Sequence, residues 1–208
     1  MFPSIPYVSL TEVSEKMDTW GSLGLPFVFF INYDGTQAWA GSREEASALG
    51  IQFAFRQESP WVTKTFSFTK SPISFEDYEA KFKHIQAGLH RGDSFLVNLT
   101  AETPIDTDAT LMDIYQHAQA LYKLRVQDQF VVFSPECFVQ IRDERIYSYP
   151  MKGTSSATEQ GPELLRNDPK EQAEHATIVD LIRNDLSQVA FPIRVDRYKY
   201  MEEIKTHE

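Results

Sequence analysis

An apolar stretch near the N-terminus gives the first structural prediction. Residues 26–33 read PFVFFINY, and this continuous apolar character predicts a strand that is buried on both faces. Asp34 and Gly35 follow directly, and Asp-Gly is a strong hairpin-turn signal. We therefore expect the chain to reverse there and residues 37–40 to form the second strand of a hairpin.

Apolar residues at helical spacing predict two helices in the middle of the chain. The first begins at Ser74, because a serine followed three residues later by a carboxylate, Asp77, is typical of a helix N-terminus, and it ends at Gly92. The second begins near residues 108–110 and is expected to continue through Leu124.

The remaining pattern interleaves strands with one longer helix. Residues 41–60 leave both states open, because GSREEASALG has helical composition whereas IQFAFRQ alternates like a strand. Residues 155–168 are rich in Ser, Thr, Gly, Pro and charge, which predicts an exposed loop, and a helix is expected from Pro169 through Leu186. Short apolar or alternating runs predict strands at residues 94–100, 130–133, 138–140, 145–149 and 193–195.

The amino-acid composition is that of a folded chain, and the net charge argues against one class of partner. With 208 residues, of which 42% are hydrophobic, the chain has the apolar content of one globular domain or of part of a larger one. Thirty acidic and twenty basic residues give a net charge of -10, which argues against nucleic acid as the main partner.

The single cysteine and the N-terminal sequence indicate where the protein works. Cys137 cannot form an internal disulfide or a multi-cysteine metal site, and it is expected to be a small core residue. The first twenty residues lack the pattern of a signal peptide, and no apolar run approaches the roughly 20 residues of a membrane span. We expect a soluble, cytoplasmic protein that binds no membrane.

Residues 150–155, PMKGTS, are the first of three segments with candidate chemistry. Lys152 lies between a proline that fixes the backbone and Gly153, which allows a ligand to approach closely. Such a lysine acts as a nucleophile if burial or neighbouring cations lower its pKa. A solvated lysine in a turn is the commoner occurrence of this local pattern.

The predicted helix after Pro169 carries the second segment. Glu171, Glu174 and Asp185 share one face, next to a stripe that contains His175. Because Mg²⁺ takes oxygen ligands, such a face can supply part of a magnesium site. An amphipathic helix with a solvated acidic face explains the same pattern, and His175 fits a packed histidine better than a metal ligand.

The third segment is SPECF at residues 134–138. Glu136 follows the end of a predicted apolar strand, from which a carboxylate can enter a pocket as a general acid or base. A solvent-exposed glutamate is the commoner outcome at such a position.

Taken together, these segments resemble the chorismate-binding enzyme family. SPECF is followed sixteen residues later by PMKGT and then by KEQAEHATIVDLIRNDL, in the order and spacing of that family. Upstream, residues 92–100 read GDSFLVNLT and are similar to the family's GDxYQVNLT strand, with Phe95-Leu96 in place of Tyr-Gln. The resemblance is strong over residues 72–208 and loose over the first seventy.

The resemblance implies a fold and a set of site residues. The implied fold is α+β: part of a sandwich of two antiparallel sheets flanked by helices, with residues 1–208 as one incomplete domain that divides into a strand-rich part (1–71) and a motif-bearing part (72–208). The implied site consists of Lys152 as nucleophile, Glu136 as general acid, Gly153 and Thr154 at the substrate and Glu174 as a ligand of Mg²⁺.

The resemblance also implies a reaction. Family members convert chorismate to several products, and a lysine at position 152 is typical of those that make 4-amino-4-deoxychorismate for para-aminobenzoate and folate, with ammonia from a glutamine amidotransferase subunit. Anthranilate or isochorismate formation is the alternative within the family. A non-catalytic interaction fragment is the alternative outside it, because family segments expected after Glu208 are absent from the sequence, and we expect this chain by itself to bind chorismate and magnesium only weakly.

Overall fold

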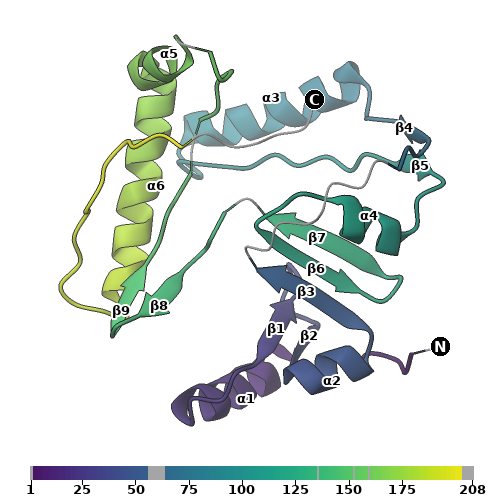
Figure 1. Ribbon diagram of the computed structural model, residues 1–208. Coiled ribbons are helices and arrows are strands. Elements are labelled where there is room, and N and C mark those ends of the chain that lie inside the picture. Colours follow the sequence, from purple (N-terminus) through teal and green to yellow (C-terminus); the bar gives the residue numbers. More distant parts are fainter. Residues whose placement is uncertain (1, 56–63, 135, 152, 159, 203–208) are drawn as a thin grey trace. The chain divides into compact units, whose positions relative to one another are not determined.

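The computed structural model describes residues 2–55, 64–134, 136–151, 153–158 and 160–202, and over these the chain has a mixed α+β fold (Figure 1). The expected α+β class is therefore confirmed. Residue contacts divide the chain into two compact units, each built from separate stretches. The first unit contains Met1–Gln52, Glu58–Gln119 and Leu124–Val132, and the second contains Phe53–Gln57, Ala120–Lys123 and Phe133–Glu208.

The described residues form six helices and several small sheets. The helices are α1 Leu10–Ser22, α2 Arg43–Ala48, α3 Phe75–Arg91, α4 Leu111–His117, α5 Gly161–Asn167 and α6 Pro169–Ser187. The strands are β1 Val28–Ile31, β2 Ala38–Gly41, β3 Ile51–Phe55, β4 Phe68–Lys70, β5 Ile105–Thr107, β6 Tyr122–Val126, β7 Phe130–Ser134, β8 Gln140–Arg142 and β9 Arg145–Tyr147. Strands β1–β2, β4–β5 and β8–β9 pair in antiparallel fashion, and β3, β6 and β7 form a sheet in the order β3-β6-β7.

The predicted N-terminal hairpin is present, with its turn at Asp34 and Gly35. The Asp34 carboxylate accepts hydrogen bonds from the backbone N–H and the hydroxyl of Thr36, and Gly35 has a φ of 71°. The expectation that the first strand is buried on both faces is wrong, because β1 alternates between half-buried and exposed residues. In this hairpin β2 is the strand that is buried along its whole length.

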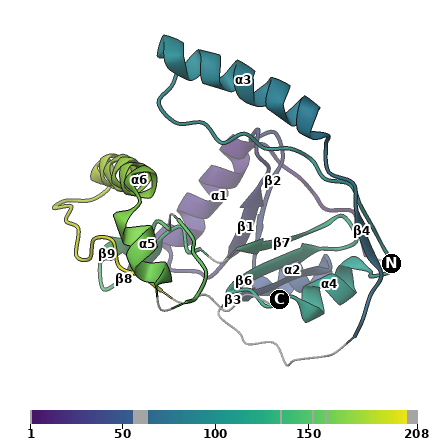
Figure 2. The same cartoon turned by 90° about the horizontal axis from the view of Figure 1, so that it is seen from above.

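Helix α1 forms the core of the first unit with this hairpin. It begins with a capping box in which Ser9 and Glu12 satisfy each other's backbone N–H groups. Val13, which is fully buried, packs against Ala38 and Ala40 of β2. Figure 2 shows α1 running along the β1–β2 hairpin. The pattern of apolar residues did not predict this helix, although its capping box is visible in the sequence.

The sheet β3-β6-β7 decides one assignment that was left open and corrects one prediction. Both states left open for residues 41–60 occur in succession, as α2 and then β3. The helix expected to continue through Leu124 ends at His117, because Ala118 is extended and the chain enters β6, which pairs with β3 and β7. Sheet pairing has overridden the helical spacing of the last apolar residues.

The turn between β6 and β7 holds the beginning of the chain. The Gln127 side chain donates hydrogen bonds to the backbone carbonyls of Pro3, at 2.7 Å, and Leu49, at 2.8 Å. The Tyr7 hydroxyl donates to the Gln129 side-chain oxygen at 2.7 Å. These bonds fix the N-terminal segment onto a turn more than a hundred residues further along the chain.

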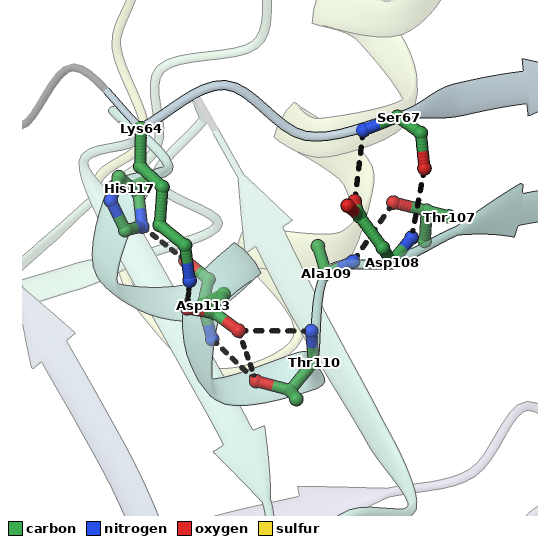
Figure 3. Close-up of polar contacts among 8 residues, drawn as sticks. All are labelled: Lys64, Ser67, Thr107, Asp108, Ala109, Thr110, Asp113 and His117. Atoms are coloured by element: carbon green, nitrogen blue, oxygen red, sulfur yellow. Dashed lines mark hydrogen bonds and ion pairs between the residues drawn. The ribbon is translucent and has the colours of Figure 1, made fainter.

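A polar cluster joins residues 64–67 to α4 (Figure 3). The Lys64 ammonium lies 2.7 Å from a carboxylate oxygen of Asp113, whose other oxygen accepts from the backbone N–H and hydroxyl of Thr110, the N-cap of α4. Hydrogen bonds from Lys64 and Thr110 hold the pKa of Asp113 well below its usual value. His117 Nδ1 lies 2.7 Å from the Asp113 carbonyl oxygen. The cluster fastens an incoming segment to the start and end of one short helix.

Helix α3 forms as predicted, but the strand expected after it does not. Ser74 caps the helix by accepting from the Asp77 N–H, and Gly92 ends it in the left-handed conformation with a φ of 83°. Residues 94–100 are not a strand, because no neighbouring strand among the described residues provides hydrogen-bond partners, and Phe95 is exposed. The strand expected at residues 193–195 is absent for the same reason.

The second unit contains the β8–β9 hairpin and helices α5 and α6. The predicted turn at Asp143 and Glu144 is confirmed, since both residues have positive φ, as a two-residue hairpin turn of type I′ requires. Part of the loop expected at residues 155–168 is instead helix α5, which Figure 2 shows beside the N-terminal end of α6. Asp168 caps α6 through the N–H groups of Lys170 and Glu171.

None of the helices in the described ranges combines the length and the apolar character that a membrane crossing needs.

Candidate functional site

A groove with a volume of about 780 Å³ lies within the second unit. One wall is the segment that follows β9 and contains the PMKGTS sequence, and α5 and the first two turns of α6 form another. Residues 199–202 complete the lining. The groove therefore brings together a predicted site segment, the predicted acidic helix and a part of the chain that had no predicted role.

Gly153 allows the PMKGTS segment to pack against α6. Its φ is 72°, in the left-handed region that favours glycine. A Cβ atom at this position would lie 2.7 Å from Oε2 of Glu171 and 2.7 Å from Cδ1 of Leu165. The absence of a side chain at position 153 is thus what lets the Glu171 carboxylate approach this segment.

Two carboxylates of α6 share one cation in the first turns of the helix. Lys170 Nζ lies 3.4 Å from an oxygen of Glu174 and 3.4 Å from an oxygen of Glu171. The side chains of Glu171 and Glu174 are 21% and 34% exposed, whereas that of Lys170 is 74% exposed. Hydrogen bonding and charge attraction to Glu174, and then to Glu171, raise the pKa of Lys170. The two carboxylates thus attract a cation at the border of the groove.

His175 stands one turn further along α6 and also lines the groove. Its ring lies 5.1 Å from the ring of Tyr198, centroid to centroid. Burial and, to a smaller extent, the positive charge of Lys199 lower the pKa of His175. This agrees with the expectation that His175 packs.

Only some of the residues expected at the site line the groove. Gly153 and Thr154 line the groove. Glu174 lies on the same helix as Glu171 but is not part of the lining, and Lys152 falls outside the described residues. Glu136 is exposed and does not line the groove, and its backbone exchanges hydrogen bonds with the Ser134 hydroxyl. The roles assigned to these residues stay predictions.

Cys137 is the next residue after Glu136 and is half-buried, with its thiol 3.4 Å from the Val139 carbonyl oxygen. The expectation of a core cysteine is thus met only in part.

Sequence patterns missed the C-terminal wall of the groove. Lys199, Tyr200, Met201 and Glu202 belong to no helix or strand, so no periodicity indicates their position. The one local signal is Tyr198, Lys199 and Tyr200, in which two aromatic residues flank a cation. Burial, followed by the negative charge of Glu202, raises the pKa of Tyr200.

The carboxylates of α6 are the kind of ligand that a hard divalent cation takes. Among the described residues no group of three or more His, Cys, Asp and Glu side chains gathers into a metal-binding cluster. Glu171 and Glu174 nevertheless present oxygen donors that already share the ammonium of Lys170, and Mg²⁺ is typically held by one or two carboxylates with water and a substrate anion.

Comparison with known proteins identifies the family. The sequence model described as "chorismate binding enzyme" matches residues 16–207, which is most of the chain. The chain belongs to the chorismate-binding enzyme family. The groove-lining segment and α6 both fall within the matched range, and the resemblance seen in SPECF, PMKGT and KEQAEHATIVDLIRNDL is thereby confirmed.

Individual relatives of this chorismate-binding family member differ in how much of their length matches. An uncharacterized PabA-like protein of Pasteurella multocida (strain Pm70) is 42% identical over 207 residues, which cover 96% of this chain and 64% of that protein. Aminodeoxychorismate synthase component 1 of Klebsiella aerogenes is 33% identical over 183 residues, covering 79% and 38%. Anthranilate synthase component 1 of Mycolicibacterium smegmatis is 30% identical over 200 residues, covering 83% and 38%.

The chain thus spans less than two thirds of the length of these relatives. No solved structure matches it.

Proposed function

We propose that this chain is the chorismate-using portion of an aminodeoxychorismate synthase component 1, which replaces the 4-hydroxyl group of chorismate with an amino group. The observation that carries the proposal is the groove in which the segment around Lys152 meets the acidic start of α6 through Gly153. The 33% identity to the Klebsiella aerogenes enzyme supports this product choice. Lysine at position 152 is also typical of family members that make aminodeoxychorismate.

In the proposed reaction the Lys152 amine attacks the chorismate ring and the 4-hydroxyl group leaves. The hydroxyl departs as water with a proton from a general acid; Glu136 is the candidate that the family resemblance gives, although it does not line the groove. Ammonia then attacks the vacated carbon, and the bond from the ring to Lys152 breaks, which regenerates the amine. Forming a covalent adduct divides one difficult substitution into two easier displacements.

Gly153 and Thr154 are proposed to contact the substrate. The close approach of Glu171 to Gly153 supports this assignment, because a side chain at position 153 would push α6 away from the segment that carries Lys152. The absence of a side chain at Gly153 thus allows the segment around Lys152 and α6 to border the same groove.

Glu174 is proposed to hold Mg²⁺, with Glu171 beside it on the same helix. A magnesium ion there would neutralise a carboxylate of the bound substrate. The proposed ammonia source is a glutamine amidotransferase subunit, which supplies ammonia to members of the family that aminate chorismate.

Product analysis tests the proposal. A hybrid protein, in which this chain replaces the matching segment of the Pasteurella multocida relative, is incubated with chorismate, Mg²⁺ and ammonium, and its products are separated by chromatography and mass spectrometry. We expect 4-amino-4-deoxychorismate from the hybrid and loss of that product with Lys152→Ala. The unmodified relative and Lys81→Ala, a change at an exposed lysine of α3, are the controls.

Two results would contradict the proposal. Isochorismate as the sole product would assign the chain to another branch of the family. Unchanged amination by the Lys152→Ala hybrid would remove the covalent step.

Anthranilate formation is the second candidate, favoured by the 30% identity to the Mycolicibacterium smegmatis anthranilate synthase component 1. In that case the hybrid would release anthranilate, and Lys152→Ala would increase or preserve that product.

A further inference from the structure

Lys199 has an unusual backbone conformation at the edge of the groove. The residue is half-buried, lines the groove and has a φ of 53°. The left-handed region is uncommon for residues other than glycine, asparagine and aspartate, and strained residues gather at sites that hold ligands. Because a glycine or an asparagine would satisfy this backbone better, the lysine side chain itself is the feature to be explained.

The Lys199 ammonium lies near an aromatic ring, and no described carboxylate pairs with it. It lies 5.3 Å from the centroid of the Tyr198 ring. Its charge contributes to the lowered pKa of His175, so the ammonium acts on the groove wall. Over the ranges that the structure describes, no ion pair joins Lys199 to an acidic side chain, in contrast with Lys170, which contacts both Glu171 and Glu174.

Such a cation stands out in an acidic protein. The chain carries a net charge of -10, so acidic partners are plentiful. Ser155, Ser156 and Arg166 also line the groove, and side chains of these types donate hydrogen bonds to anions. The groove therefore offers several donors to a small anion, and its lining also includes the acidic residues Glu171 and Glu202.

We propose that Lys199 binds a carboxylate group of the ligand in this groove. The inference rests on the proposed function, because chorismate is a ring compound with two carboxylates. The Lys199 ammonium would then bind one carboxylate of the ligand, and the Mg²⁺ proposed at Glu174 would neutralise the other.

Ligand titrations of the 208-residue chain test this inference. Binding of chorismate, and separately of isophthalate as a simple aromatic dicarboxylate, is followed by ¹⁵N–¹H NMR up to millimolar concentrations in the presence of Mg²⁺. Three variants are compared with the wild type: Lys199→Asn, Lys199→Arg and the control Lys81→Gln. Asparagine is chosen because it removes the charge and tolerates a left-handed backbone.

We expect Lys199→Asn to weaken binding of chorismate about tenfold, the factor expected for one charge-assisted hydrogen bond. Lys199→Arg should stay within about twofold of the wild type because it keeps the charge. Lys81→Gln should bind as the wild type does. Thermal unfolding of Lys199→Asn should shift upward by about 2 °C as the backbone strain is relieved, so the weaker binding cannot be explained by a damaged fold.

Each remaining outcome is decisive. Equal chorismate affinity for the wild type and Lys199→Asn would overturn the role of Lys199 and leave the proposed function intact. Binding of isophthalate through Lys199 without binding of chorismate would support the carboxylate site and contradict the proposed function. Absence of binding for both compounds would overturn the carboxylate site, whereas the proposed function is decided by the products of the hybrid protein.

Discussion

In the first unit Lys64 contacts the Asp113 carboxylate at 2.7 Å, whereas in the second unit Lys199 lines a groove without a carboxylate contact among the described residues. The Lys64 cluster also uses both oxygens of Asp113 and the cap of α4 (Figure 3). In that cluster the charges hold two segments together. Around the groove, by contrast, Lys199 has a strained backbone, Gly153 approaches Glu171 closely, and polar residues line the open space.

The difference teaches where to look for ligand chemistry in this molecule. A charge with a nearby partner stabilises the fold locally and has little left to offer to a ligand. A half-buried charge without such a partner is costly unless something else compensates it, and a ligand can do so.

The largest effect on this comparison is expected from Gly153→Ala, which breaks the groove wall. The new Cβ would meet Glu171 and Leu165 on a backbone with a φ of 72°, so we expect a loss of about 2–3 kcal/mol in the free energy of unfolding. Urea denaturation measures it. Gly24→Ala is the matched control, because Gly24 has a φ of 66° with no atom within 4 Å, and it should cost only about 1 kcal/mol. Equal costs for the two variants would show that the contact with Glu171 is unimportant.

A smaller effect is expected in the Lys64 cluster. Thr110→Ala removes the hydroxyl that caps α4 and should reduce the free energy of unfolding by about 1 kcal/mol. Chorismate binding, followed by NMR, should not change. Thr19→Ala within α1 is the control, since its hydroxyl bonds only to the Glu15 carbonyl oxygen of the same helix, and its stability should be nearly that of the wild type. A change in ligand binding with Thr110→Ala would show that the Lys64 cluster and the groove are energetically coupled.

The pH dependence of stability sharpens the same contrast. Hydrogen bonds from Lys64 and Thr110 hold the pKa of Asp113 below its ordinary value of 3.8 in the folded protein. The unfolded chain therefore binds the proton first, and the contribution of Asp113 to stability is present above pH 3.8 and is lost as the pH falls toward the folded pKa. Urea midpoints between pH 6 and pH 3 (about the range in which carboxylates titrate) should fall less steeply for Asp113→Asn than for the wild type. Parallel curves would contradict this role of Asp113.

The smallest effect is expected at the carboxylates of α6. Lys170→Met removes the ammonium that Glu171 and Glu174 share, so Mg²⁺ should bind about twofold more tightly, as expected for release from an exposed ion pair. Isothermal titration calorimetry measures it. Lys83→Met is the matched control, because Lys83 pairs with Glu79 at the same spacing on α3 and neither residue lines the groove. Weaker Mg²⁺ binding by Lys170→Met would mean that the ammonium does not compete with the metal.

Local signals in the sequence predicted much of the fold. Ser74 and Pro169 mark the starts of α3 and α6 correctly, and Asp34-Gly35 and Asp143-Glu144 mark two hairpin turns. In each case the deciding interaction lies within a few residues of the signal. Helix α5 was missed because its N-cap, Gln160, forms no side-chain capping bond, which leaves Pro162 in the first turn as the local start signal.

Predictions that depended on distant partners were less successful. Residues 94–100 have a strand-like composition, but a strand also requires a neighbour, and none of the described strands pairs with them. At the candidate site, the motifs indicated Gly153 and Thr154, which line the groove. Lys199 could not be indicated, because only the fold brings residues 199–202 to the same groove.

The hydrogen bonds that join the N-terminal segment to Gln127 and Gln129 have a consequence for how this protein is made. Residues 3 and 7 leave the ribosome long before their partners in the turn between β6 and β7 exist. Contacts between such distant residues form late and slow the folding of a domain. A nascent chain that stops short of residue 127 therefore carries an N-terminus without its anchor, and proteases should digest that segment first.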